Sequence, residues 1–225
     1  QGSLTGWSWD LGLGADKLTT FSYYVLGDPF SYLIAFFPKG RLELGYNLLI
    51  LLRLYASGLA FLFFARQRSF KPASQLVGTL AYTFTGYSLY VSIRHPFFLL
   101  PMILFPLLAY GIDHVLSGKS WIPLAIFTGL ALISNFYFAY ILALGSLVYA
   151  VLRYLAIRQT VSLPHWRVLW QLVGAGLTGF LLAGVLFIPS LLGVLSSTRA
   201  TANFANGYWL YPLNYYLRFP NAIIT

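Results

Sequence analysis

The chain has 225 residues, of which 59% are hydrophobic and only 8% are charged, and its mean hydropathy is +0.74. Because about a quarter of the residues in a water-soluble domain are usually charged, this composition excludes a soluble globular protein and predicts a membrane protein with several spans. The net charge of +9 comes from scattered basic residues, which argues against a nucleic-acid partner and favours anionic lipid or phosphate-bearing substrates. The absence of cysteine excludes disulfides and cysteine metal sites.

Residues 1–43 are too polar and too rich in glycine to cross a bilayer, so we expect them to form an extracytoplasmic loop on the membrane surface. The loop contains Asp10, Asp16 and Asp28, and after Glu43 only Asp113 remains of the chain's five carboxylates. Acid–base chemistry by a carboxylate of this chain therefore belongs to the opening segment. The chain starts at Gln1 without a signal-peptide pattern, and we expect it to be part of a longer protein.

Six apolar stretches predict an all-α transmembrane bundle over residues 44–192. The second stretch is rich in small and hydroxyl-bearing residues, and the last has a stripe of small residues, Ala175, Gly179 and Ala183, at four-residue spacing. Small residues allow helices to approach closely, so the second stretch is expected to lie inside the bundle, and the stripe of the last stretch is suited to helix packing. The expected spans are residues 44–65, 73–92, 96–116, two crossings within 121–155, and 170–192.

The stretch 121–155 can be interpreted as one crossing or as two. A single helix of about 35 residues would be roughly 50 Å long, whereas the hydrocarbon core is about 30 Å thick, so we divide the stretch at Asn135. Two crossings place the loops 66–71, 117–120 and 153–167 on one face, as the excess of Lys and Arg in cytoplasmic loops requires. Both ends, including residues 193–225, then lie outside the cytoplasm. The three loops contain no carboxylate and seven cations, Arg66, Arg68, Lys71, Lys119, Arg153, Arg158 and Arg167.

The aspartates of the opening segment have two interpretations. Asp10, Asp16 or Asp28 could act as a general base on an acceptor hydroxyl or hold a divalent ion, or each could simply cap a turn. Asp10 is the first choice for the base because it lies between Trp9 and the turn formed by residues 12–14. Trp7 and Trp9 could stack on a sugar ring, or they could anchor the loop at the membrane surface.

Three basic residues are candidates for binding an anionic group. Arg53 lies deep in the first span, where an arginine is costly unless it is hydrated or paired, so it could bind a substrate phosphate or extend its head group to the outer surface. Arg94 and His95 lie in an outer turn and could stabilise a leaving phosphate, or they could be ordinary interfacial cations. The same two interpretations apply to Arg199 and Arg218.

Other apparent motifs do not predict a site. His95, His114 and His165 lie in separate loops or span ends, so they form no zinc-binding pattern and we predict no metal site. The sequence around Gly118-Lys119-Ser120 lacks the earlier glycine of a phosphate-binding loop. Asp113 and His114 lie at the inner end of the third span, where we expect a structural role.

A set of motifs in a fixed order resembles the YfhO family of bacterial membrane proteins over essentially the whole chain. The motifs are WSWDLGLGADK and YYVLGDPF in the opening segment, then TLAYTFTGY, the His95-Pro96 turn, PLLAYGID and SNFYFAY. The resemblance implies part of a GT-C-type glycosyltransferase with many spans. Such an enzyme is expected to transfer a sugar from a polyprenyl-phosphate carrier to a cell-envelope polymer, such as a teichoic acid, on the outer face.

The resemblance also implies a mechanism in which a carboxylate in the first outer loop activates the acceptor hydroxyl while lipid phosphate leaves. The carrier already activates the sugar, so no nucleotide cofactor is implied, and a divalent metal is left open. Because the chain starts inside that loop, an acidic residue before Gln1 is an alternative base. Two other functions stay open: a transporter or flippase of lipid-linked sugars, and a non-catalytic scaffold in envelope assembly.

Overall fold

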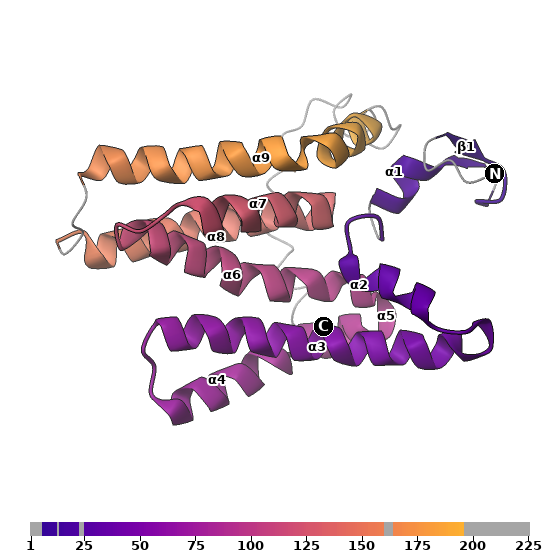
Figure 1. The fold of residues 1–225 in the computed structure, drawn as a ribbon, viewed down its shortest axis with the longest axis horizontal. Coiled ribbons are helices and arrows are strands. Elements are labelled where there is room, and N and C mark those ends of the chain that lie inside the picture. The colour runs from indigo at the N-terminus through magenta and orange to yellow at the C-terminus, as the bar shows by residue number, and fades with distance from the viewer. Residues whose placement is uncertain (1–5, 13, 23–24, 160–163, 196–225) are drawn as a thin grey trace, which may run out of the picture.

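The computed structural model describes residues 6–12, 14–22, 25–159 and 164–195, and this part of the chain is almost entirely helical (Figure 1). The tail expected over residues 193–225 lies outside it from residue 196 onward, as do Tyr23 and Tyr24 of the quoted motif. The opening segment consists of short elements. They are the antiparallel strands β1 (Trp7–Ser8) and β2 (Ala15–Asp16), the helices α1 (Lys17–Ser22) and α2 (Pro29–Tyr32), and the 3₁₀ turns η1 (Leu33–Phe36) and η2 (Lys39–Arg41).

Four long apolar helices confirm the prediction of a helical membrane protein. These are α3 (Leu42–Gln67), α6 (Leu100–Leu116), α8 (Phe136–Ile157) and α9 (His165–Leu195), and each contains or forms most of a segment long and apolar enough to cross a membrane. A fifth apolar helix, α7 (Ile122–Ser134), has 13 residues and is shorter than a usual span. The total of six crossings stays a prediction.

Helix α6 lies at the centre of the bundle, between α3 on one side and α7 and α8 on the other (Figure 1). Its buried face is a continuous apolar stripe at helical spacing, including Leu104, Leu108, Ile112 and Val115. This stripe packs against Leu124 and Ala125 of α7 and against side chains of α8 and α9. Helix α9 packs mainly on α7 and forms the outer layer of the bundle.

The expected second span, residues 73–92, is wrong as a single helix. The structure divides it into α4 (Pro72–Thr83) and α5 (Gly86–Arg94), which are followed by the 3₁₀ turn η3 (Pro96–Leu99). The break has a local cause, because the Thr85 side chain accepts a hydrogen bond of 3.2 Å from the backbone N–H of Ser88 and so begins a new helix. The expected place of this span inside the bundle is wrong as well, because α4 packs on α3 at the surface and only Thr83 of α4 is buried.

The predicted division at Asn135 is confirmed. Asn135 is buried and has extended backbone, and its side-chain oxygen accepts hydrogen bonds from the backbone N–H groups of Tyr137 and Phe138, at 2.8 and 3.3 Å. An asparagine in this role satisfies the free N–H groups at a helix start, so α8 begins here and the chain reverses direction.

The two ends of the bundle, which can be followed in Figure 1, carry different kinds of residues. At one end lie residues 66–71, 117–120, 153–159 and 164–167, which we call the basic end. Asp113 holds this end together, because it pairs with Arg153 at 2.9 Å and with Arg68 at 3.5 Å and accepts a hydrogen bond from the Tyr149 hydroxyl. The structural role expected for Asp113 is therefore confirmed. The opposite end carries the strands, α1, α2 and the Asn135 turn, and we call it the hairpin end.

The small-residue stripe of the last span packs inside the bundle, as predicted. Ala175 and Ala183 are fully buried. A methyl group added at Gly179 would lie 2.6 Å from the Thr128 side chain and 2.8 Å from the carbonyl oxygen of Ala125, so α7 and α9 touch at this glycine. Such close backbone approach is the usual reason for glycine at a helix–helix contact in a membrane.

Replacing Gly179 by valine should therefore destabilise the bundle by about 1–3 kcal/mol, the usual range for overpacking. Gly176→Val is the matched control, because a side chain at Gly176, in the same helix, would meet no atom within 4 Å. The stability of both variants is measured by heating the detergent-solubilised protein and determining, by size-exclusion chromatography, how much folded protein remains. Equal loss of stability in the two variants would contradict the assigned contact.

Candidate functional site

The most distinctive feature of the hairpin end is a buried ion pair between Asp28 and Arg53. Asp28 is 0% exposed and Arg53 is 3% exposed. One carboxylate oxygen of Asp28 accepts a 3.0 Å hydrogen bond from the backbone N–H of Phe30 and thereby caps α2. The other oxygen accepts a 2.6 Å bond from the Ser31 hydroxyl and pairs with Nη2 of Arg53. Both oxygens of this carboxylate are therefore engaged by groups of the protein itself.

Arg53 is held from several sides. Its Nη1 donates to the carbonyl oxygen of Leu49 at 3.3 Å, its Nη2 donates to the Ser31 hydroxyl at 3.0 Å, and its guanidinium carbon lies 5.4 Å from the centre of the Phe30 ring. The expected alternative that Arg53 extends to the outer surface is wrong, because the side chain is buried. Pairing with Asp28 compensates the charge of this arginine in an apolar helix instead, while its buried Nε has no hydrogen-bond partner among the described residues.

Gly27, the residue before Asp28, brings the same loop into close contact with α7. A methyl group added at Gly27 would overlap the carbonyl oxygen of Ile133, near the end of α7. The segment that carries Asp28 is thus held between α3, through Arg53, and the turn that contains Asn135. Phe30 also packs against the main apolar core. The opening segment is docked on the bundle by these contacts.

The strands form a small hairpin that displays the two tryptophans. Trp7 is paired with Asp16 across the hairpin, and the rings of Trp7 and Trp9 lie 5.7 Å apart at an angle of 73°. The side chains are 60% and 76% exposed. Both rings rest on Gly14, whose φ of +96° and lack of a side chain permit the contact, since a methyl group there would lie 2.8–2.9 Å from ring atoms. Exposed aromatic surface of this kind can stack on a ligand or insert among lipid head groups.

The three candidate aspartates have different surroundings. Asp10 follows Trp9 and is exposed, Asp16 is partly buried in β2, and Asp28 is fully buried. The sequence favoured Asp10 only for its position between Trp9 and the glycine turn, and the structure separates the three by their access to solvent. Of the three, Asp10 is the carboxylate that a substrate can reach most directly. A base must come within hydrogen-bonding distance of the proton it removes.

Arg94 and His95 lie at the C-terminal end of α5, and both are exposed. The His95 ring lies 5.6 Å from Phe97 and 5.3 Å from Phe98, and Phe98 in turn packs on Phe138 beside the Asn135 turn. These contacts place His95 at the hairpin end. Within the part of the chain that the structure describes, no hydrogen bond or ion pair joins Arg94 or His95 to the Asp28–Arg53 pair.

The described residues contain no group of three or more His, Cys, Asp or Glu side chains that could hold a metal ion. The oxygens of Asp28 are already engaged by Phe30, Ser31 and Arg53. The hairpin end is therefore characterised by an exposed carboxylate, exposed indole rings and exposed cations, above a buried ion pair.

Together, the apolar helices and the segment docked at one end define a helical membrane protein with a polar, aromatic surface at the hairpin end. The family of bacterial membrane proteins named YfhO matches residues 1–225, and the chain belongs to this family. Neither a protein of curated function nor a solved structure was found to match the chain.

A double-mutant cycle tests the buried pair. Arg53→Met leaves the Asp28 charge buried without its counter-ion and should cost about 3–5 kcal/mol of stability, as should Asp28→Asn, which leaves Arg53 unpaired. The double variant buries neither charge and still caps α2, so it should lose clearly less stability than the two single changes added together. The free energy of unfolding is measured by denaturation in detergent for the unchanged protein, the two single variants and the double variant.

Arg94→Met is the control for the loss of a positive charge at the same end, and it should change stability little because Arg94 is exposed. Strict additivity of the Asp28 and Arg53 changes would show that the two side chains do not depend on each other.

Proposed function

We propose that the protein is part of a membrane glycosyltransferase that transfers a sugar from a polyprenyl-phosphate carrier to a cell-envelope polymer, such as a teichoic acid. The proposal places the hairpin end on the outer face of the membrane and the basic end in the cytoplasm. The distribution of cations supports this orientation, because Lys and Arg concentrate in cytoplasmic loops. Membership of the YfhO family supports a membrane location.

The observation that carries the proposal is the docking of the acidic, aromatic opening segment onto one end of the bundle through Asp28 and Arg53. In this proposal Asp28 is a positioning residue rather than the base, because its carboxylate is buried and fully hydrogen-bonded. Arg53 has the same role, since its guanidinium is buried and pairs with Asp28. Together they hold the hairpin where a lipid-linked substrate would arrive.

The chemistry is assigned to the exposed groups. Asp10 takes the proton of the acceptor hydroxyl while the hydroxyl oxygen attacks the anomeric carbon of the sugar. The bond from that carbon to the phosphate oxygen breaks, and its electron pair leaves with the phosphate. Arg94 and His95 stabilise the negative charge that develops there. Trp7 and Trp9 stack on the sugar, and Asp16 is the second candidate for the base.

Asp10→Asn should lower sugar transfer by about 10²–10⁴-fold, the usual contribution of a positioned base. The measurement is transfer of labelled sugar from polyprenyl phosphate to envelope polymer, in membranes that contain the protein as the cell makes it. Glu43→Gln is the matched control, because Glu43 is an exposed carboxylate at the same end outside the hairpin. Unchanged transfer in both Asp10→Asn and Asp16→Asn would exclude these residues as the base.

One observation favours a second function, transport of a lipid-linked sugar. The break between α4 and α5 produces two short helices in place of one span, and discontinuous helices are typical of transporter binding sites. A transporter needs no base, so movement of labelled lipid across liposome bilayers, unaffected by Asp10→Asn and without sugar transfer, would favour this alternative.

A further inference from the structure

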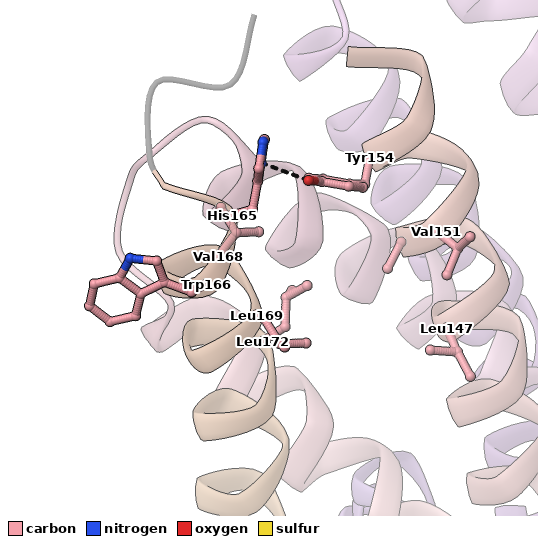
Figure 2. Close-up of a pocket in the computed structure, with 9 residues that line it drawn as sticks. Leu147, Val151, Tyr154, His165, Trp166, Val168, Leu169 and Leu172 are labelled. Carbon is pink, nitrogen blue, oxygen red and sulfur yellow. Dashed lines mark hydrogen bonds between the residues drawn. The ribbon is translucent and has the colours of Figure 1, made fainter. Parts of the chain in front are cut away.

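An apolar groove lies between α8 and α9 near the basic end (Figure 2). The hairpin lies at the opposite end of these helices (Figure 1). Its volume is about 420 Å³, within the range of about 300–1,000 Å³ that bound small molecules usually occupy. The groove extends over two helical turns on each helix, or about 10 Å. Its walls are Leu147, Ala150 and Val151 of α8 and Val168, Leu169 and Leu172 of α9.

A polar group closes the groove towards the basic end. The Tyr154 hydroxyl and Nδ1 of His165 are hydrogen-bonded at 2.7 Å, and Figure 2 shows this pair joining the two helices above the apolar walls. Trp166 also borders the groove, and its indole ring is 60% exposed and points outward. A tryptophan with these properties is typical of the level of the lipid head groups.

The charge around this end is positive. Arg158 follows Tyr154 by one helical turn, and the Arg167 guanidinium lies 5.4 Å from the centre of the Trp166 ring. The sequence contains no acidic residue after Asp113, which already pairs with Arg68 and Arg153. Among the described residues, neither Arg158 nor Arg167 has a carboxylate partner. The polar border of the groove therefore complements an anion.

The two helices leave most of their apolar surface open to the membrane. Only 6% of the most apolar part of Tyr137–Ile157 and 17% of that of His165–Pro189 is buried inside the structure. Hydrocarbon can thus reach the groove from the side. A ligand that suits both the walls and the border must combine an alkyl chain with a negatively charged head group.

We propose that the groove between α8 and α9 binds one anionic phospholipid of the leaflet at the basic end. One acyl chain lies between Leu147 and Leu172, and the phosphate rests at the Tyr154–His165 pair within reach of Arg158 and Arg167. Basic residues close to a membrane surface attract anionic lipid, and the groove adds a fixed place for the chain. This site lies at the end opposite the proposed sugar chemistry and does not depend on it.

Photo-cross-linking tests the proposal. The probe is phosphatidylglycerol with a photoreactive group in one acyl chain, added to the purified full chain in detergent, with labelled residues mapped by mass spectrometry. Labelling is expected on the α8 and α9 segments that form the groove. Leu169→Trp fills the groove and should abolish labelling there. Leu181→Trp, an equal change at a site in α9 that is 75% exposed and outside the groove, should not.

The charge requirement is tested with the same probe. Arg158→Gln combined with Arg167→Gln should weaken binding of the probe on the order of 10-fold. Lys119→Gln, which removes a cation from the same end but outside the groove, should have little effect. Equal labelling by a phosphatidylcholine probe, an equal effect of Leu181→Trp and Leu169→Trp, or full displacement of the probe by inorganic phosphate would each overturn the proposal.

Discussion

The buried pairing of Asp28 with Arg53 is the interaction on which the hairpin end depends. An arginine in the middle of an apolar helix is unfavourable unless a carboxylate or water compensates its charge, and an aspartate without solvent has the same need. Each residue therefore requires the other. Because Asp28 also caps α2, meeting this requirement fixes the direction of the chain that leads from the hairpin into α3. The pair thus fixes the end of the opening segment that enters the bundle, whereas the hairpin at the start of that segment keeps its side chains exposed.

Much of the fold could be predicted from the sequence because the membrane restricts the choice. Apolar stretches of sufficient length have to be helices, and the excess of cations in three loops identifies the end that they share. The division at Asn135 followed from length and charge, and the buried stripe of Ala175, Gly179 and Ala183 followed from residue size. The sequence analysis did not predict the break at Thr85. A threonine can cap a helix or pack between helices, and the sequence alone does not distinguish these two roles.

The site was predictable only in part. Sequence reasoning identified Arg53 as exceptional and placed the aspartates in the opening segment, but it treated each charge separately. The partner of Arg53 lies 25 positions earlier in the chain, and no periodicity connects a loop residue to a helix residue at that distance. The number of acidic residues was the one useful signal for the partner of Arg53, because the chain has only five carboxylates that could neutralise a buried cation. The different exposure of Asp10, Asp16 and Asp28 depends on folding and has no signature in composition.

The shortness of α7 has a consequence for the surrounding lipid. Its 13 residues rise about 20 Å, about 10 Å less than the thickness of the hydrocarbon core. In the six-span arrangement predicted from the sequence, one of the polar turns that flank α7, at Ser120 or at Asn135, would lie below the level of the head groups, or the lipid would thin to meet it. Either outcome would lower the membrane surface next to α6. For the proposed sugar transfer, such a place would let a water-soluble polymer and a lipid-borne head group meet without either leaving its own phase.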